Sequence, residues 1–453
     1  MFKLLLIAFS FHLVMAKFPN FEKRPPFIHK PLNDVGERLV LTSYIEAGQL
    51  IEAREAAEVH LEDFHNITSY SGYFTVDKEN NGSLFFWYFP SENNYKEDPV
   101  ILWLQGGPGG SSLFGLFTEN GPFTVENGTV SLREFSWHKN HSIIYIDQPV
   151  ETGFSFTDGP LVSDQTQVGE HLYSALKQFF TLFSELQSNK FFVSGESYAG
   201  KYVPSIAYAI HTKNPTADLK INLQGILIGN GLSDPRHQMV YGDLVYQLGL
   251  IDNNTLAQIH QFEDKTTEEI DKGNFQAAST YWYTLVGIIE YKAAVGDIYN
   301  FLKDFDDSPT DWANFIVQDR VRKALHVGNQ QFSTVNLKVY SELFPDITKS
   351  VAPWVSELLS HYRTLIYNGQ LDIIVGYALT ANYLQNLEFS SATEYATAER
   401  NVWYVGNRVA GYVKAAGNLT EVLVRNAGHM VPFEQPEFAS DLVYKFVRNE
   451  SLA

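Results

Sequence analysis

Short apolar runs alternate with longer stretches of helical periodicity through much of the chain. Four runs rich in Val, Ile, Leu and Phe have the length of buried strands: 100–104, 143–146, 191–193 and 226–228. Between the second and the third run, apolar residues recur at helical spacing from Val168 to Phe183. Strands that alternate with helices in this way predict an α/β fold, with a mostly parallel sheet covered by helices on both faces.

Other segments extend this pattern at both ends. Residues 69–76 and 83–89 are aromatic stretches joined by Asp-Lys-Glu-Asn-Asn-Gly, which predicts a hairpin. Strand-like runs return after a long interval, at 364–367, 402–405 and 421–424. The interval, 236–345, has the pattern of helices and connectors, and an insertion at the C-terminal edge of a strand would cover a site there. We therefore expect a core in two parts, 61–235 and 346–453, with a mainly helical insertion or cap at 236–345.

The first residues have the features of a secretory signal peptide. Lys3 is followed by an apolar run from Leu4 to Val14, and Val14-Met15-Ala16 suits signal peptidase. This run is too short for a membrane anchor, and no later run is apolar enough to span a bilayer. We expect 1–16 to be removed and 17–60 to form an N-terminal arm or propeptide-like segment.

Composition excludes some classes of binding partner and indicates the cellular compartment. The 453 residues carry a formal net charge of −19, which argues against nucleic acid or an anionic membrane as a partner. The chain has no cysteine, so disulfides and thiol chemistry are excluded. Asn-x-Ser/Thr sequons fit a secretory route that ends outside the cell or in a lysosome-like or vacuolar compartment. The candidate glycosylation sites are Asn66, Asn81, Asn127, Asn140, Asn253, Asn418 and Asn449.

The strand-like run at 191–193 ends in Gly-Glu-Ser-Tyr-Ala-Gly, with Ser197 at its centre, and a helix-like segment follows. Strand, sharp turn with Ser, then helix is the context of a nucleophile elbow. Gly195 and Ala199 are small, as so sharp a turn requires. By itself the motif is as compatible with an ordinary turn as with a nucleophile.

Two later strand-like runs are each followed by a residue that would complete a catalytic triad. Asp372 follows 364–367, and His429 follows 421–424. The order Ser, Asp, His is that of α/β-hydrolases, in which His429 would take the proton of Ser197 and Asp372 would orient the imidazole. A turn-forming Asp and a structural His are the alternatives for each residue taken alone.

A glycine-rich stretch, residues 105–112, follows the first of the four strand-like runs. It lacks the Gly-Lys-Ser/Thr ending and the G-x-G-x-x-G spacing of phosphate-binding loops. Its position instead suits an oxyanion hole formed by the backbone N–H groups of Gly107 and Tyr198. The sequence has no H-E-x-x-H motif and no paired histidines at ligand spacing, so we expect no metal and no cofactor.

Glu196, next to the candidate nucleophile, is unexpected beside a site that stabilises negative charge. A protonated carboxyl, or one that shares a proton with a second acid, would donate a hydrogen bond to a negatively charged substrate. The alternative is a Glu that faces solvent.

The chain resembles the serine carboxypeptidase family, and within it the vitellogenic carboxypeptidase-like branch. The matching segments cover most of the chain from about Ser69: Trp103–Ser112, Glu119–Pro122, Asp147–Ser155, Gly195–Gly200, Asn368–Asp372 and Gly428–Pro432. Six such segments in a fixed order make a chance match improbable.

The resemblance implies release of C-terminal residues from peptides or proteins through an acyl-enzyme, favoured in mild acid. It assigns the triad to Ser197, Asp372 and His429, and the oxyanion hole to Gly107 and Tyr198. It also implies that the terminal carboxylate of the substrate is held by Gln105, Gly106, Glu119 and Glu196, and that Met430 lines the pocket for the leaving residue.

Three positions depart from the family pattern: Gln105 replaces an Asn, Gly110 replaces a Cys, and Glu151 replaces a smaller residue. Because the chain has no disulfides, we expect it to stay a single uncleaved chain. The sequence is compatible with a monomer and with a homodimer. Two other functions also stay open, an acyltransferase with the same triad and a catalytically silent secreted binding or storage protein. The complete triad argues against the silent protein.

Overall fold

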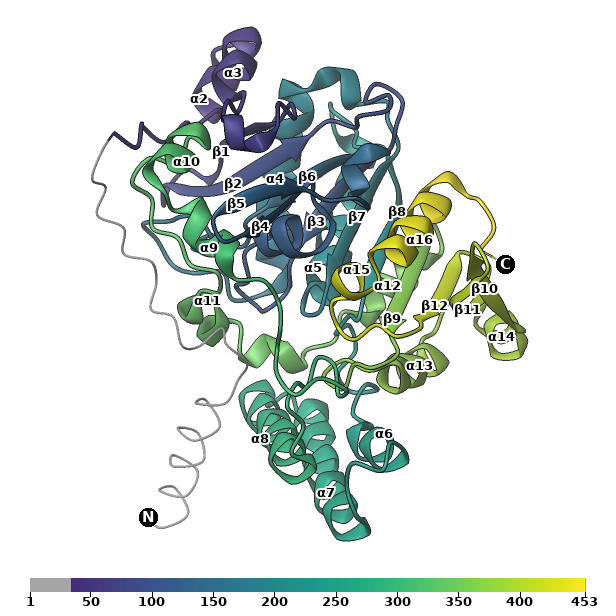
Figure 1. Ribbon diagram of the computed structural model, residues 1–453. Coiled ribbons are helices and arrows are strands. Elements are labelled where there is room, and N and C mark those ends of the chain that lie inside the picture. Colours follow the sequence, from purple (N-terminus) through teal and green to yellow (C-terminus); the bar gives the residue numbers. More distant parts are fainter. Residues whose placement is uncertain (1–33, 453) are drawn as a thin grey trace, which may run out of the picture.

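A ten-stranded sheet forms the centre of the molecule in the computed structural model, which describes residues 34–452 (Figure 1). The expected signal peptide and residues 17–33 lie outside the described residues. The strand order is β1-β2-β6-β3-β7-β8-β9-β12-β11-β10, and a separate pair is formed by β4 and β5. The strands are β1 Tyr70–Asp77, β2 Gly82–Phe89, β3 Val100–Leu104, β4 Phe123–Glu126, β5 Thr129–Leu132, β6 Ser142–Ile146, β7 Phe191–Glu196, β8 Leu223–Gly229, β9 Arg363–Gly369, β10 Arg400–Val405, β11 Arg408–Ala416 and β12 Leu419–Val424.

The six central strands pair in parallel; in sheet order they are β6, β3, β7, β8, β9 and β12. The two strands at one edge, β1 and β2, and the two at the other, β11 and β10, pair antiparallel. The C-terminal ends of the central strands therefore share one edge of the sheet. The expected hairpin is present as β1 and β2, with Tyr70 opposite Tyr88. The sequence pattern did not predict β11, whose Ala and Gly residues weaken the apolar alternation; it pairs with β10 and β12.

Alternate side chains of the central strands enter two separate cores, one on each face of the sheet. In β3, Leu102 packs into one core and Trp103 into the other; in β7, Val193 and Phe192 divide in the same way. This is the two-residue period of a pleated strand whose two faces are both covered. The apolar runs are continuous because both sets of side chains are buried.

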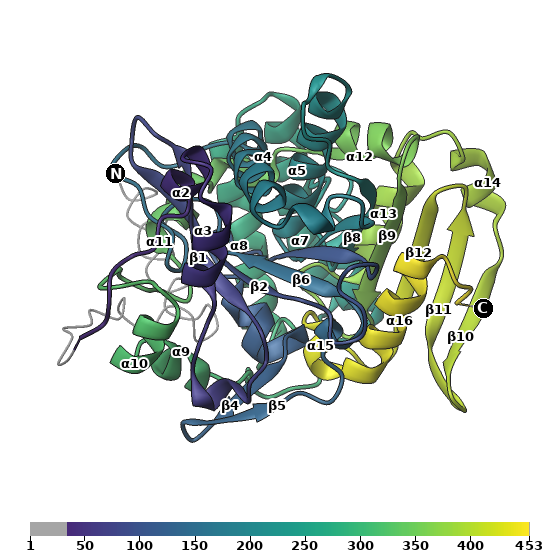
Figure 2. The same cartoon turned by 90° about the horizontal axis from the view of Figure 1, so that it is seen from above.

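Helices cover both faces of this sheet. Figure 2 shows α4, α5 and α12 on one side, and α15 and α16 on the other. The helices are α2 Thr42–Glu46, α3 Leu50–Ala57, α4 Gln165–Leu182, α5 Ala199–Lys213, α6 Tyr241–Gln247, α7 Asn253–Asp271, α8 Phe275–Ala293, α9 Asp311–Ile316, α10 Asp319–Ala324, α11 Leu337–Glu342, α12 Ala352–Leu359, α13 Tyr377–Asn386, α14 Ala392–Thr397, α15 Val431–Glu434 and α16 Pro436–Arg448.

The segment between β8 and β9 is helical and divides into two regions. Helices α6, α7 and α8 project below the sheet in Figure 1, where α7 and α8 pack against each other. Helices α9 and α10 instead lie beside the β4–β5 pair. There Trp312 of α9 stacks on Phe117 at a centroid distance of 5.7 Å. Phe117 belongs to a π-helical turn, Gly115–Asn120, that also carries Glu119.

Candidate active site

Ser197 lies at the turn between β7 and α5, with a left-handed φ of +66°. Non-glycine residues adopt this conformation rarely, and usually where the surrounding structure enforces it. Here Ser197 N donates to Gly229 O at 3.0 Å, and Ser197 O accepts from Leu232 N at 3.0 Å. A Cβ at Gly195 would lie 2.6 Å from Leu104 O, so only glycine fits beside the turn. The geometry is that of a nucleophile elbow.

The glycine-rich loop after β3 lies directly against this elbow. A Cβ on Gly106 would lie 2.6 Å from both Tyr198 N and Glu196 O. Gly107 has a φ of +116°, in the region that favours glycine. Tyr198 is the N-cap residue of α5, and the first N–H groups of a helix have no intrahelical partner. Close backbone contact therefore brings the Tyr198 amide beside Gly106, in the same loop as Gly107, as the expected oxyanion hole requires.

The Tyr198 side chain anchors the start of α5 in a buried polar network. Its hydroxyl donates to Asp346 Oδ2 at 2.5 Å, and Gln165 Nε2 donates to the same oxygen at 2.8 Å. Lys201, fully buried, pairs with this carboxylate at 3.3 Å. None of these supporting residues was predicted from the sequence, because they come from three separate segments.

Asp372 and His429 follow the neighbouring parallel strands β9 and β12, and they are hydrogen-bonded to each other. Nδ1 of His429 lies 2.8 Å from Oδ2 of Asp372, and both side chains are buried. Nε2 of His429 has no hydrogen-bond partner within residues 34–452. It lines the same pocket as Ser197. The imidazole is thus held from one side, and its other nitrogen is available in the pocket.

Two residues that were not predicted from the sequence fix this pair. Asn230 Nδ2 donates to Asp372 Oδ2 at 2.7 Å, and Tyr299 O accepts from His429 N at 2.7 Å. Asn230 follows β8, the strand between β7 and β9, and has a left-handed φ of +42°. Its place at the end of an intervening parallel strand is the signal that would have identified it.

Glu196 and Glu119 form a buried pair behind the nucleophile, and neither side chain faces solvent. Trp103 Nε1 donates to Gln105 Oε1 at 3.0 Å, which directs the Gln105 amide nitrogen toward Glu196 Oε1 at 3.2 Å. Neither Glu119 oxygen, nor Oε2 of Glu196, has another protein donor in the described chain. Two carboxyls in contact satisfy one another only when one of them carries a proton.

The electrostatics of the pair agree with a bound proton. Burial, together with the neighbouring carboxyl of Glu119, raises the pKa of Glu196 well above its usual value. Burial also raises the pKa of Glu119, to about 7. The pair therefore holds at least one proton in mild acid and loses it as the pH rises toward and beyond neutral.

A pocket opens above these groups. Its walls combine the glycine-rich loop with aromatic and apolar side chains from the segment between β8 and β9. The residues that line it are Gln105, Gly106, Gly107, Gly110, Phe114, Glu196, Ser197, Tyr283, Tyr299, Asp306, Ser308, Thr334, Val335, Leu337, Tyr340, His429 and Met430. Glu119 is not in the lining and lies behind Glu196. Of the three departures, Gln105 and Gly110 line the pocket, whereas Glu151 is bound outside it through its carbonyl to Asn336 Nδ2 at 2.6 Å.

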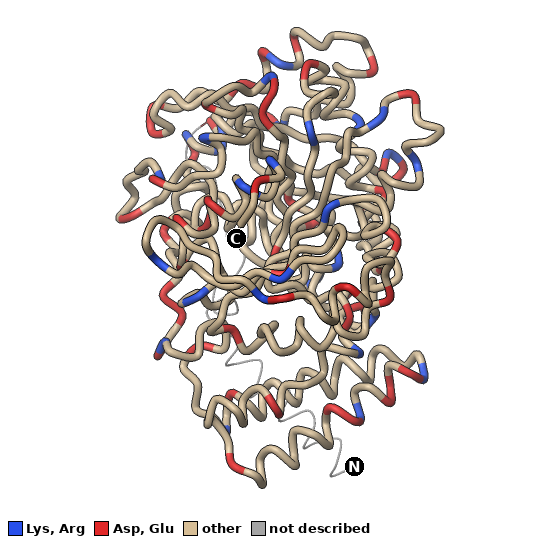
Figure 3. Tube along the Cα trace, turned by 90° about the vertical axis from the view of Figure 1, so that its right-hand side faces the viewer, with Lys and Arg blue, Asp and Glu red and all other residues tan. Residues whose placement is uncertain are grey.

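The surface gives further context. Figure 3 shows acidic and basic positions interspersed along the trace. No helix within residues 34–452 has the length and apolar character needed to cross a membrane.

The sequon residues Asn66, Asn81, Asn127, Asn253 and Asn449 are exposed, whereas Asn140 and Asn418 are half-buried. Asn418 Nδ2 already donates to Leu359 O at 2.9 Å.

Comparison with known proteins identifies the family. The serine carboxypeptidase family matches residues 60–449. A venom serine carboxypeptidase of Apis mellifera is 46% identical over 99% of each chain, and a vitellogenic carboxypeptidase of Aedes aegypti is 44% identical over 92% of this chain and 91% of its own. The crystal structure of a prohormone-processing carboxypeptidase of Saccharomyces cerevisiae aligns with a TM-score of 0.77 at 25% identity, covering 87% of this chain and 96% of that one. The α/β-hydrolase fold is therefore confirmed, and the chain belongs to the serine carboxypeptidase family.

Proposed function

We propose that this carboxypeptidase cleaves the last peptide bond of its substrates through an acyl-enzyme on Ser197. Oγ of Ser197 attacks the carbonyl carbon while Nε2 of His429 takes its proton. Asp372 holds the imidazole tautomer and stabilises the imidazolium that forms. The backbone N–H groups of Gly107 and Tyr198 stabilise the oxyanion of the tetrahedral intermediate.

The second half of the reaction uses the same groups. His429 gives the proton to the leaving amine, and the C–N bond breaks to leave an ester on Ser197. Water then attacks the ester carbonyl, with His429 as general base, and Ser197 recovers its proton as the ester bond breaks. The products are the shortened peptide and one free amino acid.

Recognition of a free C-terminus is assigned to the carboxyl pair. A protonated Glu196, supported by Glu119 and Gln105, donates a hydrogen bond to the terminal carboxylate of the substrate, and the Gly106 backbone completes this subsite. Ionisation of the pair replaces that donor with a repelling charge, so binding weakens as the pH rises. Met430 contacts the leaving residue. A preference for mild acid, as in a lysosome-like compartment or an acidic secretion, follows.

The observation that carries this proposal is the buried Asp372–His429 pair, whose free Nε2 shares a pocket with Ser197 at a strained elbow. An organophosphonate label tests it directly. We expect one label per chain, on the peptide that contains Ser197, with parallel loss of dipeptide hydrolysis. Labelling and activity should both vanish in Ser197→Ala, while its melting temperature stays near that of the wild type. Near-normal hydrolysis by this variant would refute the assignment.

The sequons also support a proposal about modification. Asn66, Asn81, Asn127, Asn253 and Asn449 are the expected glycan acceptors because they are exposed. Asn418 is expected to stay unmodified, since its amide is engaged with Leu359. Mass spectrometry of the secreted protein before and after deglycosylation would test this, and a glycan on Asn418 would contradict it.

A further inference from the structure

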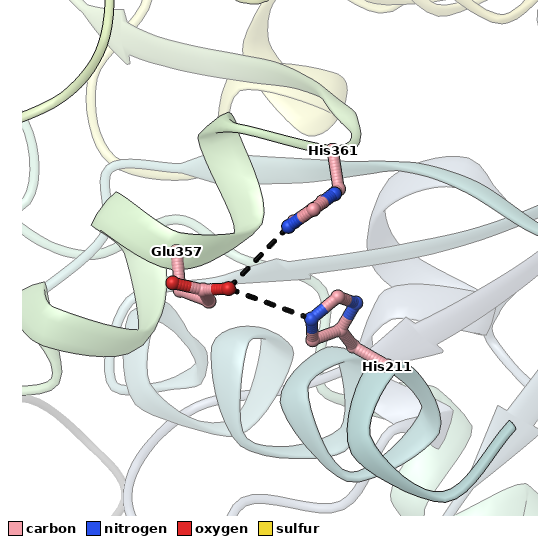
Figure 4. Close-up of side chains that lie close together, drawn as sticks. All are labelled: His211, Glu357 and His361. Carbon is pink, nitrogen blue, oxygen red and sulfur yellow. Dashed lines mark ion pairs between the residues drawn. The ribbon is translucent and has the colours of Figure 1, made fainter. Parts of the chain in front are cut away.

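A cluster of His211, Glu357 and His361 lies at the surface, away from the pocket, with its three side chains pointing toward one another (Figure 4). Each side chain offers one ligand atom, and these three atoms all lie within 4.8 Å of one another. No other such group of His, Asp or Glu side chains is found within residues 34–452. We propose that these residues form a binding site for a divalent transition-metal ion of the zinc type.

The spacing of the cluster fits ligands around an ion. Nε2 of His211 lies 3.6 Å from Glu357 Oε1, and Nε2 of His361 lies 3.4 Å from the same oxygen. Both distances exceed those of ordinary N–H···O hydrogen bonds, about 2.7–3.2 Å. Ligand atoms bound at about 2.0–2.2 Å around a tetrahedral ion lie about 3.3–3.6 Å apart. The two separations from Glu357 are therefore those of ligands around such an ion, and the half-exposed side chains of Glu357 and His361 have room to adjust.

The donor set suits zinc. Two imidazole nitrogens and one carboxylate oxygen are typical ligands of Zn²⁺, with a water molecule in the fourth position. Nδ1 of His211 lies 3.2 Å from the Tyr362 hydroxyl. In the tautomer whose Nδ1–H donates to that oxygen, Nε2 presents its lone pair to the ion, an arrangement common for metal-bound histidines. Glu357 and His361 are about half exposed, so an ion reaches them from solvent.

Two of the three ligands lie near the ends of helices, His211 in α5 and Glu357 in α12, whereas His361 follows the end of α12. Tyr208 of α5 stacks on Trp354 of α12 at 5.4 Å, and His211 and Glu357 lie three residues further along each helix. The two helices therefore run in the same direction here, and both present their C-terminal ends to the cluster. The carbonyl ends of helices carry partial negative charge and attract cations.

A bound ion would join the end of α5 to α12. Ser197 precedes the first turn of α5, and His211 lies about 18 Å along that helix from Ala199. The ion is thus a structural link in a chain without cysteine, and it takes no part in hydrolysis. Spacing along the sequence reveals only Glu357 and His361, four residues apart, because His211 comes from a distant segment.

The test uses the untagged mature protein and Zn²⁺ alone. Calorimetric titration at pH 7.5 is compared for the wild type, His211→Ala, Glu357→Gln, His361→Ala and the control His60→Ala, whose exposed imidazole has a single carboxylate neighbour. We expect one site whose affinity falls at least about tenfold in each of the three ligand variants and is unchanged in the control. Zn²⁺ should raise the melting temperature of the wild type and the control by about 2–4 °C, and EDTA should reverse the rise.

A spectroscopic experiment identifies the coordination. Co²⁺ bound to the wild type should give the intense visible bands of a tetrahedral ion, and Glu357→Gln should lose them. In EDTA, Glu357→Gln and His361→Ala should melt at the temperature of the wild type, because both side chains are about half exposed. Equal Zn²⁺ affinity in the wild type and the three ligand variants, or no binding at all, would overturn the proposal.

Discussion

The side-chain amide of Gln105 donates to Oε1 of Glu196 at 3.2 Å, and this bond decides which oxygen of Glu196 is free. The amide cannot be reversed without losing the bond from Trp103 to the Gln105 carbonyl oxygen. Oε2 of Glu196 is therefore left without a protein donor and is the oxygen of this side chain available to hold the pair's proton. The additional methylene of Gln105, relative to the Asn expected from the family pattern, still allows the amide to reach Glu196.

Glu196→Gln should make the KM for substrate nearly independent of pH. The Gln amide keeps a donor at every pH, so KM for an N-blocked dipeptide should stay nearly constant from pH 5 to pH 8. In the wild type, KM should rise across this range as the pair loses its proton. Steady-state kinetics across the range measure the difference.

A matched control for this variant is Glu263→Gln. Burial also raises the pKa of Glu263, but this residue does not line the pocket. It should leave the pH profile of KM as in the wild type. If Glu196→Gln kept the rise of KM with pH, recognition of the carboxylate by this group would be wrong.

The carboxyl pair should also make stability depend on pH. Burial raises the pKa of Glu119 from 4.5 to about 7, so between these values the folded chain binds more protons than the unfolded chain. The free energy of unfolding contributed by this group is complete below pH 4.5 and falls as the pH rises toward 7. Glu119→Gln should flatten that part of the profile in denaturant titrations. An equally steep fall in the variant would contradict the assignment.

Asn230→Gly should lower kcat with little change in KM. The substitution removes the bond to Asp372 but keeps the left-handed φ of +42° accessible. Loss of a group that orients a catalytic carboxylate costs about tenfold in rate. The control is Asn127→Gly, an exposed position with a φ of +50°. A decrease of kcat in both variants, or in neither, would argue against a positioning role for Asn230.

Gly106→Ala should damage the oxyanion hole. The new methyl group would lie 2.6 Å from the Tyr198 nitrogen and the Glu196 carbonyl, and backbone atoms cannot give way as a side chain can. We expect kcat to fall by about 10²–10³, the cost of losing one oxyanion donor. Gly128→Ala, at an open surface turn with a φ of +74°, is strained but should keep its kcat. Unchanged kcat in Gly106→Ala would show that the loop does not constrain the hole.

The sequence predicted the parts of the site that lie at strand ends. Ser197, Asp372 and His429 follow apolar runs recognisable as buried strands, and parallel strands deliver their C-terminal residues to one edge. The fold class followed from the same alternation and is confirmed by the family match. Glu196 was conspicuous because a carboxyl beside a nucleophile conflicts with the local chemistry.

The rest of the architecture depends on contacts between distant segments. Asn230 is an ordinary residue in a glycine-rich turn until β8 is placed between β7 and β9. Strand β11, with its Ala and Gly residues, is stabilised by its neighbours and gives little pattern of its own. The interval between β8 and β9 divides into two regions because Trp312 packs on Phe117, a contact that periodicity does not reveal.

The most direct test compares an N-blocked dipeptide with its C-terminal amide, each assayed near pH 5 and near pH 7. Both substrates offer the same scissile bond to Ser197, and only the free acid offers a carboxylate to Glu196. We expect strong preference for the acid at pH 5 and a smaller preference at pH 7. Equal rates for acid and amide at both values would contradict the account. Labelling of Ser197 without hydrolysis of either substrate would contradict it too, and would favour an acyltransferase.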